Sequence, residues 1–137
     1  MKKRNLLLAT AAVVAMGAVA TSARAQDAVK IGVLTDLSGT YSDISGQGSV
    51  VATKMAIDDF IAKEKPSFKV ELLSADHQNK ADIAANKARE WFEKDGVDLV
   101  TDLVTSSTAL AASKIAKEKN KIAIVNGAAT TALTNKE

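Results

Sequence analysis

Cysteine, histidine, proline and aromatic residues are scarce in this sequence of 137 residues. It has no cysteine, one histidine and one proline, and aromatic residues make up 4%. The lack of cysteine excludes a disulfide-stapled scaffold, a cysteine-ligated zinc site, an iron–sulfur cluster and a thiol nucleophile. One histidine leaves little material for acid–base catalysis. The remaining composition, 47% hydrophobic and 25% charged, is typical of a soluble globular protein with at most one domain.

Acidic residues are missing from the first 25 positions, which contain Lys2, Lys3, Arg4 and Arg24. The formal net charge of +2 for the whole chain therefore becomes −2 for residues 26–137. A mildly acidic chain gives no support for nucleic-acid binding, which depends on basic surfaces.

Residues 1–25 have the three parts of an export signal. A basic start is followed by an apolar run over 6–19 and by small residues on both sides of Arg24. We expect cleavage after Ala25 and a periplasmic mature protein. A retained membrane anchor is the alternative, but the run is shorter than the roughly 20 residues that span a bilayer. No cysteine follows the expected cleavage site to carry a lipid anchor.

From residue 26 onward, short runs rich in Val, Ile and Leu alternate with longer helical segments. This pattern is typical of βαβ units, whose parallel strands are covered by helices on both faces. We therefore predict an α/β fold with a doubly wound parallel sheet. The expected strands are 29–35, 68–74, 97–103 and 121–125, and the expected helices are 49–64, 80–94 and 107–119.

The helix over 80–94 has the most distinct apolar face. We expect Asn79 to cap its start and Gly96 to end it in a left-handed conformation. Trp91 lies on the apolar face, so we expect it to pack in the core rather than stack on a ligand. The helix over 49–64 has a weaker apolar face, made by Val50, Thr53, Ile57, Phe60 and Ile61.

Hydroxyl and small side chains follow two of the expected strands. They form Thr-Ser-Ser-Thr at 105–108, before a helix, and Asn-Gly-Ala-Ala-Thr at 126–130. Carboxyl ends of parallel strands share one edge of the sheet, where ligands of this fold class bind. A helix N-terminus there offers unpaired N–H groups and partial positive charge to an anion. The alternative is that Ser106 or Ser107 only caps its own helix.

Nucleotide-binding and catalytic motifs are weak or missing. The Gly-Gln-Gly sequence at 46–48 precedes a helix, but the sixth position of a dinucleotide fingerprint would be Val51. No P-loop and no nucleophile elbow is present. His77 at a strand end is a possible base for Ser106 in a secreted hydrolase. We expect His77 to be a polar loop residue beside the cleft instead.

Three aspartates, Asp36, Asp76 and Asp102, lie near expected strand ends. This spacing is similar to the acidic pocket of response-regulator receivers. Those domains work in the cytoplasm, which conflicts with the expected export signal.

A series of short motifs runs through residues 26–137. They are VLTDLSG (33–39), Gly46, AIDDF (56–60), Asp76, AANK (84–87), DGVD (95–98), TSST (105–108) and GAAT (127–130). In order and spacing the series resembles the opening of type I periplasmic binding proteins of the branched-chain amino-acid class. The resemblance implies an extracytoplasmic solute-binding component of an ABC importer, which is not an enzyme and clamps its ligand between two α/β lobes.

The resemblance also implies a binding site for the ligand's carboxylate on the first lobe. By motif position, the implied ligand-binding residues are Thr105, Ser106, Ser107, Ala128 and Thr130. The implied partners are a small-molecule ligand and an inner-membrane ABC permease, with no nucleic acid and no cofactor or metal, and the protein is expected to be a monomer. A periplasmic ligand sensor of the same fold is the alternative.

One position departs from the leucine-binding pattern. Those proteins carry an aromatic residue just before the glycine that matches Gly46, whereas this chain has Ser45 there and Tyr41 four residues earlier. We include both residues in the expected ligand site. A larger ligand, such as an aromatic amino acid or an aromatic carboxylate, fits Tyr41 at least as well as a branched-chain amino acid does.

The resemblance further implies that residues 26–137 form part of the first lobe, with the hinge and second lobe outside this chain. A sheet without its later strands keeps an open edge. A chain of this length also buries a modest share of its unfolded surface. We therefore expect marginal stability and weak or no ligand binding from this length of chain by itself.

Overall fold

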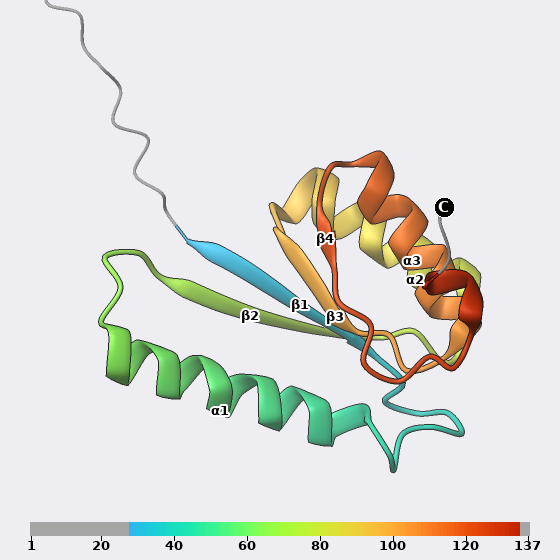
Figure 1. The fold of residues 1–137 in the computed structure, drawn as a ribbon, viewed down its shortest axis with the longest axis horizontal. Helices are drawn as coiled ribbons and strands as arrows, with labels where there is room; N and C mark the ends of the chain where they lie inside the picture. Colours follow the sequence, from blue (N-terminus) through green and yellow to red (C-terminus); the bar gives the residue numbers. More distant parts are fainter. Residues whose placement is uncertain (1–27, 135–137) are drawn as a thin grey trace, which may run out of the picture.

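A parallel sheet of four strands forms the centre of the protein (Figure 1). The computed structural model describes residues 28–134; the expected export signal and its cleavage site lie outside them. The strand order is β2-β1-β3-β4. The strands are β1 (Val29–Thr35), β2 (Val70–Asp76), β3 (Leu99–Asp102) and β4 (Ile122–Ala123). The predicted α/β fold with a doubly wound parallel sheet is confirmed.

Helices cover both faces of the sheet (Figure 1). α1 (Gly46–Glu64) lies on one face. α2 (Ala81–Glu90) and α3 (Ser106–Glu118) pack against each other on the opposite face. Two short helical turns, Trp91–Asp95 and Thr131–Leu133, follow α2 and β4. No helix within residues 28–134 is long and apolar enough to cross a membrane.

The hydrophobic core lies between the sheet and the α2–α3 pair. Leu34 and Val100 from the sheet meet small alanines on both helices, which allow the helices to approach closely. Trp91 is 3% exposed and belongs to this core, as predicted. Gly32 on β1 makes room for it: a Cβ atom at Gly32 would lie 2.4 Å from the indole ring.

Several predicted boundaries differ from the structure. β2 begins and ends two residues later than predicted, because its register with β1 pairs Val29 with Val70 and Thr35 with Asp76. β4 has two residues instead of five, although the Ile124 N–H still donates to the Val100 carbonyl over 2.9 Å. Pairing with a neighbouring strand sets these ends, and a composition pattern does not contain that pairing.

The start of α2 corrects the prediction for Asn79. Asn79 does not cap the helix; its φ is +53°, and Lys80 is the residue that precedes the first helical one. A turn causes the difference, since the Lys80 N–H donates to the His77 carbonyl over 2.8 Å. The left-handed ending at Gly96 is confirmed, with a φ of +71°.

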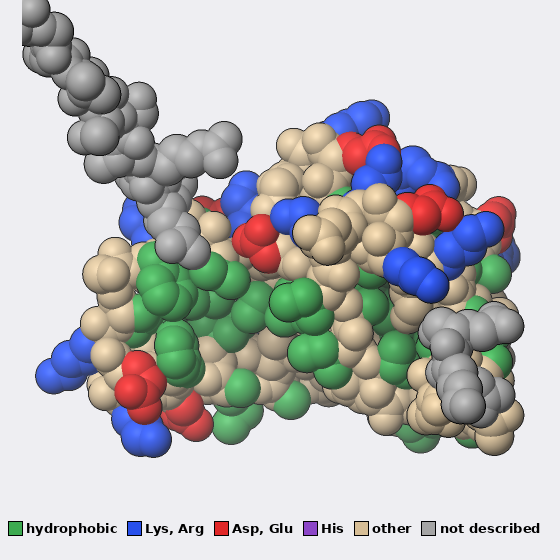
Figure 2. Space-filling view, turned by 45° about the horizontal axis from the view of Figure 1, so that its top comes forward, with side chains coloured by type: hydrophobic (Ala, Val, Ile, Leu, Met, Phe, Trp, Pro, Cys, Tyr) green, Lys and Arg blue, Asp and Glu red, His purple; other side chains and the backbone are tan. Residues whose placement is uncertain are grey.

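α1 leaves an apolar groove between itself and the sheet. Phe60 is 42% exposed, so the predicted apolar face is only partly covered. The groove, about 580 Å³, lies toward the amino ends of the strands, and Figure 2 shows hydrophobic side chains gathered where the described chain begins. It is lined by Val29, Ile31, Ala52, Thr53, Ala56, Ile57, Phe60, Phe68, Val70, Leu99, Thr101 and Ile124.

Candidate ligand site at the carboxyl edge of the sheet

Strand register brings the expected site loops to one edge of the sheet. Thr35 at the end of β1 pairs with Asp76 on β2, and Leu34 pairs with Asp102 on β3. The loops that follow β1, β2 and β3 therefore start side by side. Asp102 and Leu103 have φ values of +82° and +51°. Such values are uncommon away from glycine and tend to occur at functional sites.

The start of α3 presents hydroxyl groups at this edge. Thr105 precedes the first helical residue, and its Oγ1 lies 2.8 Å from the Oγ1 of Thr108. Within residues 28–134, no side chain caps α3, and the Ser106 and Ser107 hydroxyls have no hydrogen-bond partner. The capping alternative is therefore not observed. The first turn keeps N–H groups and two hydroxyls available for an anion.

The segment after β4 passes directly against this helix start. A Cβ atom at Gly127 would lie 3.1 to 3.2 Å from atoms of Val104, so the two backbones are in close contact. Ala128 and Thr130 lie farther along, in a hollow of about 630 Å³ against the flank of α3. The Thr130 hydroxyl accepts a hydrogen bond from the Ala132 N–H over 3.3 Å. The structure thus places these two residues beside α3 rather than at its first turn.

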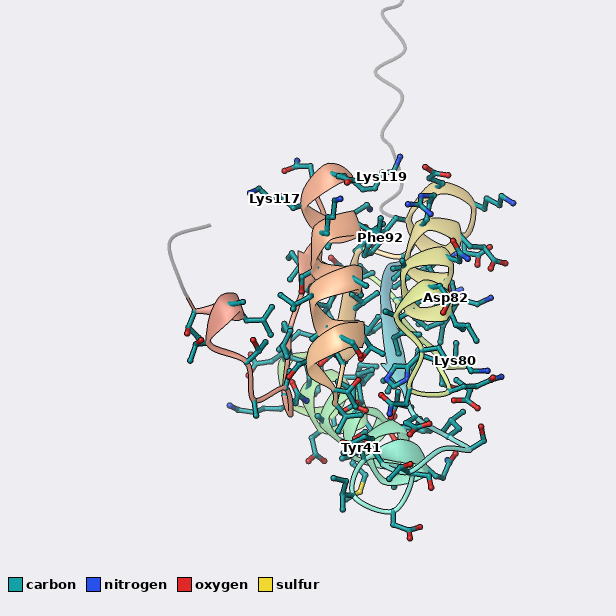
Figure 3. All side chains as sticks on the ribbon, turned by 90° about the vertical axis from the view of Figure 1, so that its right-hand side faces the viewer. Tyr41, Lys80, Asp82, Phe92, Lys117 and Lys119 are labelled. Atoms are coloured by element: carbon teal, nitrogen blue, oxygen red, sulfur yellow. The ribbon has the colours of Figure 1, made fainter. Side chains whose placement is uncertain are left out.

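The loop between β1 and α1 carries the two remaining predicted residues. Ser45 is 7% exposed, and its hydroxyl lies 3.2 Å from the Thr35 hydroxyl and from the Tyr41 carbonyl. Tyr41 is half-buried. In Figure 3, Lys117 and Lys119 mark one end of the molecule, where α3 finishes. Tyr41 lies at the other end, where α3 begins.

His77 differs from its expected position as a polar loop residue beside the cleft. It is fully buried, with 0% exposure. Its Nδ1 accepts a hydrogen bond from the Asn79 N–H over 3.0 Å, and its Nε2 is buried without a partner in the described chain. Burial lowers the pKa of His77, although Asp36, Asp76 and Asp102 partly oppose that shift. No hydrogen bond joins His77 to Ser106 among residues 28–134, so the hydrolase arrangement gains no support.

The lowered pKa of His77 predicts a loss of stability in mild acid. The unfolded chain binds a proton at about pH 6.5, whereas the folded chain binds it only at lower pH. The free energy of unfolding should therefore fall as the pH decreases from 7.5 through 6.5 and below. His77→Asn keeps an acceptor for the Asn79 N–H but does not titrate, so its curve between pH 7.5 and 5 should be flatter. Urea unfolding followed by Trp91 fluorescence measures both curves, and equal slopes would contradict the prediction.

Metal binding has no support at this edge. Among the described residues, no group of three or more His, Asp or Glu side chains is placed to hold a metal ion. Two of the three aspartates at the strand ends, Asp36 and Asp76, instead accept hydrogen bonds from backbone and hydroxyl groups, whereas the buried Asp102 Oδ2 has no partner in the described chain. Asp36 accepts hydrogen bonds from the N–H groups of Gly39 and Tyr41 over 2.8 and 3.0 Å.

Sequence reasoning missed the roles of Asp36 and Asp76 in this loop. An aspartate followed three residues later by glycine, as at Asp36 and Gly39, is a signal for a side chain that binds its own turn. For Asp76 no local signal exists, because its partners Leu37 and Ser38 lie 39 and 38 residues away.

Comparisons with known proteins agree with this fold. A family model described as periplasmic binding protein matches residues 28–137. A periplasmic binding protein from Burkholderia mallei is 51% identical with a TM-score of 0.74, over 80% of this chain and 29% of that one. A branched chain amino acid ABC transporter periplasmic ligand-binding protein from Burkholderia xenovorans is 48% identical with a TM-score of 0.69, over 74% of this chain and 27% of that one.

A third structure has a bound ligand. It is the solute binding protein of an ABC transporter from R. palustris in complex with 4-hydroxybenzoate, 26% identical, with a TM-score of 0.64 over 79% of this chain and 29% of that one. No curated protein matches the chain. This chain spans less than a third of the length of each of these three solved proteins. It belongs to the type I periplasmic binding proteins of the branched-chain amino-acid ABC transporter class.

Proposed function

We propose that this protein is an extracytoplasmic solute-binding protein that captures a small carboxylate-bearing ligand for an ABC importer. The observation that carries the proposal is the start of α3, where N–H groups and the free hydroxyls of Ser106 and Ser107 face no protein acceptor in the described chain. A helix N-terminus stabilises an anion by about 0.3 to 1 kcal/mol, or about 2 kcal/mol when partly buried. Each hydrogen bond to a charged group adds roughly 1.5 to 3 kcal/mol.

The relatives support a carboxylate as the shared ligand chemistry. The protein from B. xenovorans is described as a branched chain amino acid transporter component, and the one from R. palustris holds 4-hydroxybenzoate. Amino acids and aromatic acids differ in their side groups but have the same carboxylate. We therefore assign the carboxylate to Thr105, Ser106 and Ser107. We assign Ala128 and Thr130, which line the hollow along the flank of α3, to the remainder of the ligand.

Tyr41 supports the larger of the two ligand types. Tyr41 lies in the β1–α1 loop at the end of the molecule where α3 begins. Its ring there suits contact with an aromatic ligand more than with a short aliphatic chain. An amide NMR titration of the full-length mature protein with 4-hydroxybenzoate, leucine and phenylalanine tests this assignment, since it detects weak binding. Shifts at 105–107 with every carboxylate are expected, and no shift with any of them would overturn the proposal.

Thr130→Ala should weaken ligand binding with little change in fold. The hydroxyl lines the hollow beside α3, and its bond from the Ala132 N–H is exposed, so the fold loses little. Loss of one hydrogen bond to the ligand should cost about 0.5 to 1.5 kcal/mol of binding free energy, roughly two- to tenfold in Kd. Thr131→Ala is the matched control, since that exposed side chain makes no hydrogen bond in the described chain. Calorimetry or NMR titration measures the two affinities, and equal values would remove Thr130 from the site.

The proposed function includes export by the predicted signal, cleavage after Ala25 and delivery to an inner-membrane permease. A periplasmic sensor would use the same ligand site and report to a receptor instead. Uptake of labelled ligand by cells with and without the gene distinguishes these roles, because only an importer component changes uptake. A hydrolase would consume the ligand, so recovery of unchanged 4-hydroxybenzoate after incubation separates it from a binding protein.

A further inference from the structure

The loop that carries Tyr41 is held by carboxylates from two different strands. Asp36, at the end of β1, accepts from the N–H groups of Gly39 and Tyr41. Asp76, at the end of β2, accepts from the Leu37 N–H over 3.0 Å. The loop therefore depends on a side chain from a neighbouring strand as well as on its own turn.

Asp76 uses both oxygens of its carboxylate in these contacts. Its Oδ1 accepts from the N–H groups of Leu37 and Gln78, over 3.0 and 2.7 Å, and its Oδ2 accepts from the Ser38 hydroxyl over 2.6 Å. Burial opposes the charge, but these three bonds and the adjacent His77 more than offset it, so the pKa of Asp76 is lowered. The carboxylate joins the β1–α1 loop to the β2–α2 loop at the site edge.

We propose that Asp76 is a positioning residue for the ligand site: it fixes the β1–α1 loop, and thereby Tyr41, at the edge where α3 begins, without touching the ligand. This inference rests on the proposed function. Leu37 and Ser38 are exposed, so the loop has little apolar burial of its own at this point. Hydrogen bonds to Asp76 hold Leu37 and Ser38, and those to Asp36 hold Gly39 and Tyr41, so Asp76 sets where the loop leaves β1.

A matched control lies at the opposite edge of the sheet. Asp98 precedes β3, accepts from the Lys30 N–H over 3.1 Å and pairs with Lys121 over 3.0 Å, and its pKa is lowered as well. Asp98→Ala removes a carboxylate with similar contacts but far from the loop. It should cost stability and leave Tyr41 and ligand affinity unchanged.

Tyr41 is the only tyrosine in the sequence, so fluorotyrosine labelling gives one ¹⁹F NMR signal for the loop. Asp76→Ala should move or broaden that signal in the ligand-free protein and weaken binding of 4-hydroxybenzoate about tenfold, as expected if the competent loop conformation falls to about a tenth of its population. Asp76→Asn should restore both, because the amide oxygen accepts from Leu37 and the amide nitrogen donates to Ser38. If Asp76→Ala does not fold, Ser38→Ala at an exposed position replaces it, and we expect the same two changes with a smaller size.

The outcomes separate this inference from the proposed function. A Tyr41 signal unchanged in Asp76→Ala, or in Ser38→Ala where that variant replaces it, overturns the positioning role, as does a loss of affinity without a change in that signal. Equal effects of Asp98→Ala overturn it as well, since they indicate general destabilisation. Wild-type protein that binds neither 4-hydroxybenzoate nor leucine overturns the proposed function. In that case the positioning role falls too, whatever the Tyr41 signal shows.

Discussion

Ser107→Asp should weaken carboxylate binding and stabilise α3 at the same time. The substitution places a negative charge in the first turn of the helix, where it interacts favourably with the helix dipole by about 0.3 to 1 kcal/mol. The same charge repels a ligand carboxylate bound at that turn. At a separation near 4 Å the repulsion is about 1 kcal/mol in water and about 4 kcal/mol at a protein surface, so Kd should rise roughly 5- to 1000-fold.

Opposite signs in stability and affinity make this prediction specific. A variant that merely disturbed the fold would lose both. Asn86→Asp is the control, because it adds the same charge at an exposed position on α2, away from the site edge. Urea unfolding and NMR titration with 4-hydroxybenzoate measure the two quantities. Unchanged affinity in Ser107→Asp would move the carboxylate site away from the start of α3.

Gly32→Ala should destabilise the protein strongly for so small a change. The new methyl group would lie 2.4 Å from the Trp91 ring, inside van der Waals contact, so the buried indole or β1 must shift. Overpacking of this kind costs about 1 to 3 kcal/mol. Trp91 is the only tryptophan, so its emission reports both the altered packing and the unfolding transition in urea.

Gly48→Ala is the matched substitution with the opposite expected sign. Gly48 lies in α1, and apart from its chain neighbours and the local helix backbone no atom is within 4 Å of a Cβ atom placed there. Alanine favours a helix over glycine by about 0.5 to 1 kcal/mol, so this variant should be more stable than the wild type. A Gly32→Ala protein as stable as the wild type would show that the indole ring moves freely, against its place in the core.

Local features of the chain were predictable where short-range physics decides them. The apolar face of α2, the core position of Trp91 and the left-handed Gly96 follow from helical periodicity and from glycine's backbone freedom. The hydroxyls at 105–107 were predicted to lie before a helix, and α3 begins at Ser106. The site assignment itself remains a prediction from the family resemblance.

Other features depend on contacts that no short window contains. His77 was expected beside the cleft but is buried, because the turn at 77–80 folds it inward and Asn79 N–H binds its ring. The partial cover of α1 has the same cause. The sequence shows which residues of α1 are apolar, but it does not show that Phe60 remains exposed beside an open groove.

The sequence by itself determined the class of fold, the order of its elements and the hydroxyl-rich edge, because each depends on residues close together in the chain. Only the tertiary structure decided how that edge is held together. Asp76 reaches a loop 38 residues away, and Ser45 turns its hydroxyl toward Thr35 instead of solvent. The physical reason is that strand register and loop packing minimise the number of unpaired buried polar groups across the whole sheet, and distant residues supply those partners.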